Sequence, residues 1–267
     1  MKKTLRNILF LAILASRSLS DAGAPKEVSM GTTIVALRTK QGVIVGADTR
    51  TSQGSMVSNR YANKLSFLYQ KGPVSCVLCR SGSAADTQFL ADQARWQFRS
   101  RALDYGMHEI SLNAIAQWFR YVVRNGDYSA SLLCVGFDPK DGGRILSISN
   151  TGALLEEPVY AAAGSGSSYI IGLMDSKIRE RAGELMDEDE AIQFMAHLID
   201  RAVARDSASG GAARMVIMNE QGSRSVIVNP PSSSSISLQE HFGEKDLKGF
   251  KPAAKPKTVL GSQPGTQ

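Results

Sequence analysis

The residues that could do chemistry stand at the start of the segment 31–50, GTTIVALRTKQGVIVGADTR. Cleavage of the bond between Gly31 and Thr32 would leave a threonine that carries both a hydroxyl and a free α-amine. A threonine hydroxyl is a poor nucleophile until a base takes its proton. An α-amine has a pKa of about 7.7–8.0, so part of it is a free base near neutral pH. A terminal threonine would therefore supply nucleophile and base together, although the dipeptide alone favours the simpler interpretation that Gly-Thr opens a strand.

The elements that must position this threonine follow from the hydrophobic pattern. Apolar segments at 33–37 and 43–46 flank a polar turn, which is typical of a β-hairpin. Ser83, with Asp86 three residues later, predicts the start of a helix. The pattern predicts further helices from about 111, around 170–178 and from 187, and further strands at 74–79, 131–137, 144–149, 213–218 and 225–228. Because the strands come in hairpins, the order predicts an α+β fold with antiparallel sheets and helices on their outer faces.

Composition narrows the class of protein. The chain has 267 residues, 43% of them hydrophobic, which is enough for one sizeable core. The net charge is +6, but the basic residues after Thr32 are scattered and form no stripe with aromatics, so we expect no nucleic-acid partner. Three cysteines argue against a disulfide framework. Cys76 and Cys79 lack a second pair and are predicted to be buried strand residues rather than zinc ligands.

The N-terminal segment allows two interpretations. Lys2, Lys3 and Arg6 precede an apolar run at 8–15, and small residues follow at 22–24, which resembles a signal peptide. The alternative is a pro-segment that ends at Gly31. No apolar run approaches the roughly 18 residues that span a bilayer, so we expect no membrane association.

Several motifs, in order along the chain, resemble those of a proteasome beta subunit, most closely the catalytic beta-1 or caspase-like type. They are Gly31-Thr32-Thr33, Gly46-Ala47-Asp48-x-Arg50, Asn63-Lys64, RSGSAADTQ at 80–88, GSGSSY at 164–169 and RDSASGG at 205–211. The resemblance covers about 31–229. It implies the four-layer αββα sandwich of N-terminal nucleophile hydrolases (peptidase family T1), with two antiparallel sheets between helix layers.

The resemblance also implies roles for the site residues. Thr32 would be the nucleophile and, through its amine, the base, while Asp48 would hold the site electrostatically. Lys64 would place a positive charge beside the hydroxyl, and Gly82 would donate its N–H to the oxyanion. The network around the amine would be formed by Ser165, Asp206 and Ser209. From the sequence alone, these three residues fit helix caps or turns better, and Lys64 fits a solvated surface lysine.

Substrate recognition is implied for a further set of positions. Arg80 matches the basic residue of the primary pocket and would pair with an acidic side chain before the cut bond. The loop of Thr51 and Ser52 would bind the substrate backbone as an added strand, and Ala84 would also contact substrate. The spacing from Lys64 to Arg80 is longer than usual for the family, which we interpret as a longer surface loop at 69–74.

The resemblance also implies a division of the chain into three segments and a set of partners. Residues 1–31 would be a propeptide removed by attack of Thr32 on the Gly31 carbonyl, 32–230 the catalytic domain, and 231–267 a tail that contacts a neighbouring subunit. No metal or cofactor is implied. The partners would be beta and alpha subunits in a barrel of four seven-membered rings, and unfolded polypeptides. The setting would be ubiquitin-dependent and other protein degradation in cytoplasm and nucleus. A non-catalytic structural beta subunit and another N-terminal nucleophile amidohydrolase remain alternatives.

Overall fold

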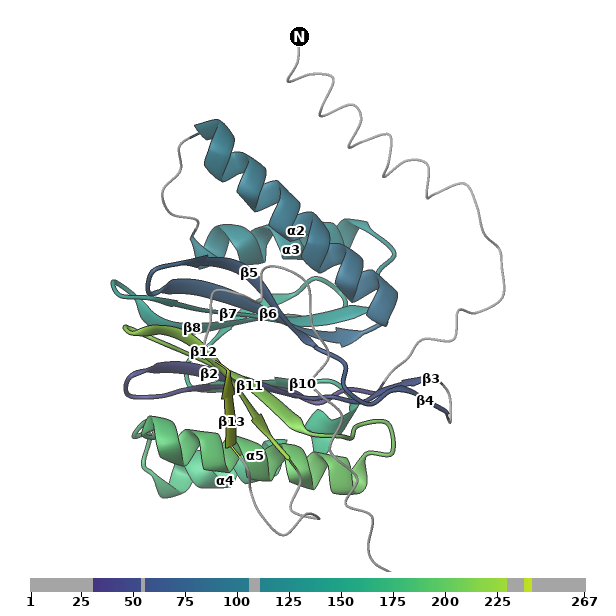
Figure 1. Cartoon of the computed structure of the whole chain (residues 1–267), viewed down its shortest axis with the longest axis vertical. Coiled ribbons are helices and arrows are strands. Elements are labelled where there is room, and N and C mark those ends of the chain that lie inside the picture. Colours follow the sequence, from purple (N-terminus) through teal and green to yellow (C-terminus); the bar gives the residue numbers. More distant parts are fainter. Residues whose placement is uncertain (1–30, 54–55, 106–110, 230–237, 242–267) are drawn as a thin grey trace, which may run out of the picture.

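A computed structural model describes residues 31–53, 56–105, 111–229 and 238–241, with the side chains of 100–105 and 238–241 excepted. Two sheets lie face to face, and a layer of helices covers each outer face, so the fold has four layers (Figure 1). This arrangement confirms the predicted α+β sandwich with antiparallel sheets between helices. The expected propeptide, apart from Gly31, and most of the expected C-terminal tail lie outside the described residues.

One sheet is six-stranded, in the order β10-β1-β2-β11-β12-β13, and every neighbouring pair is antiparallel. Its strands are β1 (Ile34–Arg38), β2 (Gly42–Asp48), β10 (Tyr160–Ala163), β11 (Ala213–Asn219), β12 (Gly222–Val228) and β13 (Leu238–His241). The hairpin predicted around the Gly-Thr motif is the pair β1 and β2. Both of these strands lie inside the sheet and are almost wholly buried, which explains why their sequences are continuously apolar.

The second sheet is five-stranded, in the order β5-β6-β7-β8-β9, and is also antiparallel. Its strands are β5 (Leu65–Lys71), β6 (Val74–Gly82), β7 (Ala130–Asp138), β8 (Gly142–Ile148) and β9 (Leu154–Glu157). A separate two-stranded ribbon pairs β3 (Thr51–Gln53) with β4 (Met56–Asn59). The two sheets enclose an apolar layer between them, which includes Ile34, Val45, Val77, Val135 and Met218. Side chains on the opposite faces of the same strands point to the helices, as the alternation of a strand requires.

Each sheet has its own helical cover (Figure 1). Helices α2 (Ala84–Tyr105) and α3 (Leu112–Asn125) pack on the five-stranded sheet, where Leu90, Phe119 and Leu132 share one core cluster. The six-stranded sheet is covered by the 3₁₀ turn η1 (Ser165–Tyr169), α4 (Ile171–Glu180) and α5 (Glu188–Arg205). Among the residues that the structure describes, no helix combines the length and apolar character needed to cross a bilayer.

Local capping signals were predicted well in the first helical layer. The Ser83 hydroxyl accepts from the Asp86 N–H at 3.3 Å, and the Ser111 hydroxyl accepts from the Ala114 N–H at 3.2 Å, so both predicted helix starts are confirmed. Cys76 and Cys79 are buried in β6, as predicted, and Cys134 is buried in β7. Asp187, with Glu190 three residues later, predicts a capping pair at the start of the last helix, and this prediction is wrong. Asp187 occupies the N-cap position of α5, but its side chain caps no N–H and forms an ion pair with Lys40 at 3.1 Å instead.

Other differences come from short or small-residue strands. Strands β9 and β10 were not predicted, because their four-residue stretches are too short to show a period of two. The loop expected at 69–74 is mostly strand, since β5 continues to Lys71 and only Gly72 and Pro73 turn the chain. The segment expected to be a polar loop after Arg50 contains β3 and β4. The helix predicted around 170–178 is divided into η1 and α4. The sequence pattern places Leu173 on the apolar face of this helix together with Met174, but Leu173 is 41% exposed.

Helix α3 gives a direct test of the first helical layer. Phe119 is fully buried beneath α3, whereas Tyr121 on the same helix is 61% exposed. We expect Phe119→Ala to lower the free energy of unfolding by about 3–5 kcal/mol, because it removes a large buried side chain and leaves a cavity. Tyr121→Ala, the matched control, should change it by less than about 0.5 kcal/mol. Urea unfolding of the purified full-length chain measures both, and equal losses would contradict the assigned orientation of α3.

Candidate active site

Thr32 lies two residues before β1, at the edge where the ends of several strands and loops meet. It is almost fully buried, and its N–H donates to the Ser165 hydroxyl at 3.2 Å. Its own hydroxyl donates to the Gly31 carbonyl oxygen at 2.6 Å. Gly31 packs so closely that a Cβ there would lie 2.3 Å from the Ala208 carbonyl oxygen. The residue before Thr32 must therefore be glycine for the chain to follow this path.

Asp48 and Lys64 form a buried ion pair beside Thr32. Asp48 is the last residue of β2 and has no exposed surface, and Lys64 lies just before β5 and is 7% exposed. The Lys64 ammonium lies 2.6 Å from Asp48 Oδ1 and donates to the Gly31 carbonyl oxygen at 3.1 Å. Asp48 accepts three further hydrogen bonds, from the backbone N–H groups of Thr33, Gly210 and Arg50 at 2.9, 2.9 and 3.1 Å. The carboxylate is thus fully paired, as a buried charge must be.

Burial dominates the electrostatics of Lys64. Desolvation lowers the pKa of its ammonium below the usual value, while the charge and hydrogen bond of Asp48 act in the opposite direction. The lysine interpreted from sequence alone as a surface residue is therefore an interior one. Its ammonium donates to two oxygen atoms, Asp48 Oδ1 and the Gly31 carbonyl oxygen.

A second carboxylate, Asp206, lies on the other side of Thr32, just after α5. Asp206 Oδ2 accepts from the hydroxyls of Ser165 and Ser209, both at 2.6 Å, and Oδ1 accepts from the Ala208 N–H at 3.1 Å. Burial alone would raise the pKa of Asp206, but these hydrogen bonds lower it below its ordinary value. Ser165 thus connects the Asp206 carboxylate to the backbone nitrogen of Thr32.

The loop after α5 is held against the hairpin by side chains from the other side of the site. The Arg50 guanidinium packs so closely on Gly210 that a Cβ there would lie 2.2 Å from it. The guanidinium also donates to the Ser207 carbonyl oxygen at 3.3 Å. The Ser52 hydroxyl donates to the Ala208 carbonyl oxygen at 3.3 Å. The loop that carries Asp206 and Ser209 is therefore clamped to the end of β2 and the start of β3.

A pocket opens beside Thr32, and Arg80 lines it together with Gly82. The other lining residues are Gly31, Thr32, Thr51, Ala62, Asn63, Lys64, Ala84, Thr87 and Gln88. Arg80 donates through Nη2 to the Asn63 carbonyl oxygen, and its buried Nε has no partner among the described residues. Burial, and then the charge of Arg95, lowers the pKa of Arg80 to about 10. Gly82 has a φ of 110°, in the region that favours glycine, and a Cβ there would lie 2.2 Å from the Ser129 carbonyl oxygen.

The structure brings the predicted site residues together from distant parts of the chain. Ser52 is the exception among the expected substrate contacts, because it is not among the pocket-lining residues. Sequence reasoning missed Asn63, Thr87 and Gln88 as lining residues, although the last two follow Ala84 by one helical turn and could have been placed by that spacing. Among the described residues, no group of three or more His, Cys, Asp or Glu side chains is placed to hold a metal ion.

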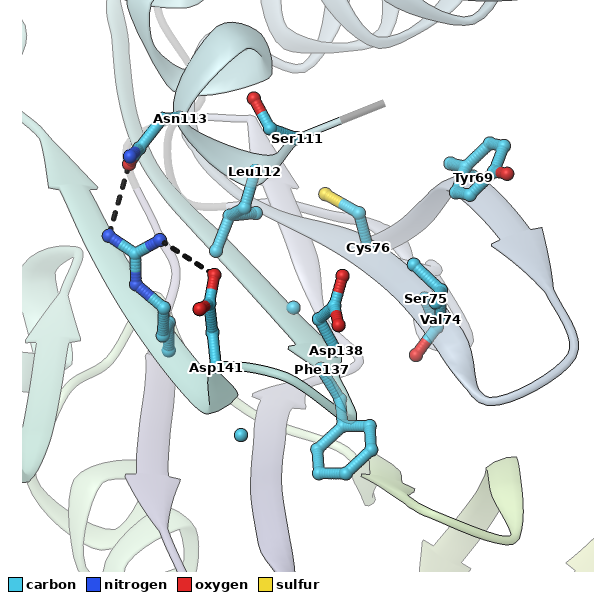
Figure 2. Close-up of a pocket in the computed structure, with 13 residues that line it drawn as sticks. Tyr69, Val74, Ser75, Cys76, Ser111, Leu112, Asn113, Phe137, Asp138 and Asp141 are labelled. Atoms are coloured by element: carbon cyan, nitrogen blue, oxygen red, sulfur yellow. Dashed lines mark hydrogen bonds and ion pairs between the residues drawn. The ribbon is translucent and has the colours of Figure 1, made fainter. Parts of the chain in front are cut away.

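A second hollow lies away from this site and contains none of the predicted site residues (Figure 2). It is bordered by the β5–β6 hairpin, the start of α3 and the turn between β7 and β8. Its one lining cation, Arg144, is already bound to Asn113 at 3.1 Å and to Asp141 at 3.7 Å. The predicted site residues Thr32, Lys64 and Arg80 line the pocket beside Thr32 instead.

Comparisons with known proteins agree on one family. The family profile described as "Proteasome subunit" matches residues 28–218. The "Probable proteasome subunit beta type-1" of Schizosaccharomyces pombe is 41% identical over 73% of this chain and 83% of its own length. The "Proteasome subunit beta type-1" of Saccharomyces cerevisiae is 36% identical over 76% of this chain and 91% of its own length. The "Proteasome subunit beta type-6" of Arabidopsis thaliana is 36% identical over 73% of this chain and 80% of its own length.

The buried ion pair can be tested through stability. We expect Lys64→Met to lower the free energy of unfolding by about 3–5 kcal/mol, because it leaves the Asp48 carboxylate buried without its counter-charge. Lys40→Met, the control, removes an exposed ion pair and should cost about 0–1 kcal/mol. Urea unfolding of the two variants beside the unaltered chain measures the difference. A Lys64→Met chain as stable as the Lys40→Met chain would show that Asp48 does not depend on Lys64.

Proposed function

This chain belongs to the proteasome subunit family as a beta subunit, and we propose that it is one of the catalytic beta subunits. Proteasome beta subunits are generally threonine peptidases. The activity that we assign is that of a threonine-type endopeptidase, which hydrolyses peptide bonds after acidic residues. The observation that carries the proposal is the position of Thr32. Its hydroxyl and the Lys64 ammonium both donate to the Gly31 carbonyl oxygen, and its nitrogen donates to the Ser165 hydroxyl.

The first reaction would be removal of the propeptide. Thr32 Oγ attacks the carbonyl carbon of Gly31, the carbon–nitrogen bond breaks, and the nitrogen of Thr32 takes a proton and becomes a free amine. Water then hydrolyses the ester, which releases residues 1–31. Lys64 would stabilise the negative charge that develops on the Gly31 oxygen, to which it already donates. Until that step, Thr32 has no free amine and cannot act as its own base.

Hydrolysis of a substrate would use the same groups. The free amine of Thr32 takes the proton of its hydroxyl, Oγ attacks the substrate carbonyl carbon, and an acyl ester forms as the leaving amine is protonated. The N–H of Gly82, at the end of β6, would stabilise the oxyanion. Water activated by the amine then cleaves the ester. Ser165 and Asp206 would orient the amine, and Lys64, held by Asp48, would favour the deprotonated hydroxyl.

The preference for acidic residues rests on Arg80. Its guanidinium lines the pocket next to Thr32 and brings a positive charge into a largely buried space. Its Nε is a buried donor with no partner among the described residues. A carboxylate in the pocket would supply the missing acceptor and the counter-charge. An uncharged side chain would leave the cation unpaired.

Proteasome beta subunits assemble with other proteasome subunits, and we place this chain with beta and alpha subunits in a four-ring barrel. Its substrates would be unfolded polypeptides in the cytoplasm and nucleus, in ubiquitin-dependent and other degradation. Residues 1–31 would be the propeptide and 32–230 the catalytic domain. Within 231–267 the four residues of β13 pair with β12, and we propose that the rest of this tail contacts a neighbouring subunit.

Replacement of the nucleophile tests the proposal directly. In particles purified from cells that carry the tagged chain, we expect the unaltered chain to begin at Thr32. Thr32→Ala should retain residues 1–31 and lose the activity toward acidic substrates, because it has no hydroxyl to attack either carbonyl. Thr39→Ala, at the other end of β1, is the control. Intact mass and N-terminal sequencing read the processing. A chain that keeps its N-terminus when unaltered would mean that it is a structural subunit.

The specificity assigned to Arg80 is a separate prediction. We expect Arg80→Gln to lower kcat/KM for substrates with an acidic residue before the cut bond about ten- to hundredfold, since hydrogen bonds to charged groups contribute about 1.5–3 kcal/mol. Cleavage after leucine should fall much less. Arg99→Gln, an exposed arginine on α2, is the control. Peptides that differ only at that residue measure the ratio, and an unchanged ratio in Arg80→Gln would remove Arg80 from the specificity pocket.

A further inference from the structure

Thr33, the residue after the proposed nucleophile, is bonded to both carboxylate networks of the site. It has no exposed surface. Its backbone N–H donates to Asp48 Oδ1 at 2.9 Å, and its carbonyl oxygen accepts from the Asp48 N–H at 3.1 Å. Its side-chain hydroxyl lies 2.8 Å from the Ser209 hydroxyl, which belongs to the Asp206 network. One residue thus connects the Asp48–Lys64 pair to the Asp206 network.

The direction of each hydrogen bond in the Asp206 network follows from counting protons. A hydroxyl has one proton, and an ionised carboxylate only accepts. Ser209 and Ser165 both donate their protons to Asp206 Oδ2, at 2.6 Å. The Ser209 oxygen can therefore only accept from Thr33, and the Ser165 oxygen can only accept from the Thr32 nitrogen, at 3.2 Å. The Thr33 hydroxyl is the donor at the far end of a chain that ends on the nucleophile's nitrogen.

The surroundings of Thr33 hold its hydroxyl in this position. A Cβ at Gly166 would lie 2.0 Å from Thr33 Oγ1 and 3.2 Å from the Ser209 hydroxyl oxygen. The hydroxyl is thus packed against the η1 backbone immediately beside Ser165. The simpler interpretation is a buried threonine that satisfies its own hydroxyl. If that were the whole role of Thr33, its hydroxyl would not need to donate to Ser209, and its backbone would not need to bind Asp48.

We propose that Thr33 is a positioning residue for the reaction at Thr32, acting through Ser209, Asp206 and Ser165. This inference rests on the proposed function. A donor to Ser209 polarises the chain of hydrogen bonds toward the carboxylate and keeps both serine protons on it. The Ser165 oxygen then always presents a lone pair to the Thr32 amine. Without the Thr33 hydroxyl, Ser209 can turn away, and the amine is held less often in the orientation that takes the proton from Oγ.

Valine and serine at position 33 separate the hydroxyl from the volume of the side chain. Valine keeps the shape of threonine and lacks the hydroxyl, whereas serine keeps the hydroxyl. Thr39→Val is the matched control, because Thr39 is a buried threonine at the other end of β1, whose hydroxyl accepts from the Gly42 N–H at 3.0 Å. Tagged particles carrying each variant are assayed with an acidic-residue peptide. The rate measured with Thr32→Ala particles is subtracted as background. Each remaining rate is divided by the fraction of chains that begin at Thr32.

We expect Thr33→Val to lower kcat about tenfold, which corresponds to about 1.4 kcal/mol, and to change KM by less than about twofold, since the Arg80 pocket is untouched. Thr33→Ser should restore kcat to within about threefold of the unaltered chain, and Thr39→Val should leave it within about twofold. A Thr33→Val particle with unaltered kcat would overturn the inference, as would a Thr33→Ser particle as slow as Thr33→Val. Failure of the proposed function is distinguishable, because the unaltered particle would then show no activity that Thr32→Ala removes.

Discussion

The structure of the site depends on one constraint, the burial of the Asp48 carboxylate. A charge with no exposed surface must be matched by a counter-charge and by hydrogen bonds to its remaining lone pairs. Lys64 supplies the counter-charge at 2.6 Å, and backbone N–H groups from three separate segments supply the rest. Satisfying Asp48 therefore fixes where the end of β2, the start of β1 and the loop after α5 meet. Thr32 is placed at that meeting point, and the same lysine reaches the carbonyl that precedes it.

The second carboxylate, Asp206, is stabilised differently from Asp48. Asp206 is held by two hydroxyls and a backbone N–H rather than by a cation, so it stays charged and polarises the serines around it. Asp48 and Lys64 act on the hydroxyl side of Thr32, and Asp206 and Ser165 act on its nitrogen. In the reaction proposed above, Thr32 is nucleophile and base at once, and each network would support one of these two roles. Thr33 joins them, because its backbone binds one carboxylate and its side chain binds the network of the other.

The apolar layers of the four-layer sandwich support the polar residues of the site. Apolar layers lie between the sheets and under each helical pair. The charged residues lie where elements end or begin: Asp48 at the end of β2, Lys64 before β5 and Asp206 after α5. Arg80 combines packing and polarity in the same way at the pocket. It is half-buried near the end of β6, burial lowers its pKa to about 10, and its buried Nε has no partner among the described residues. In the proposed pocket, this charged donor would favour an anionic ligand over a neutral one.

Local signals in the sequence predict many of the elements and the order of the motifs. The apolar runs of β1 and β2, the caps at Ser83 and Ser111 and the Gly-Thr motif are all such signals, and their helices and strands formed where expected. Strands β9 and β10 were missed, because four small or mixed residues carry no period, and the Asp187 cap was wrong because an ion pair with Lys40 competed for it. Only the tertiary structure decided that Lys64 is buried, that Asp206 and Ser165 meet at Thr32, and that Thr33 joins two networks. These are contacts between residues far apart in the chain, such as Thr33 and Ser209, and they exist because strand pairing and burial bring the ends of the elements together.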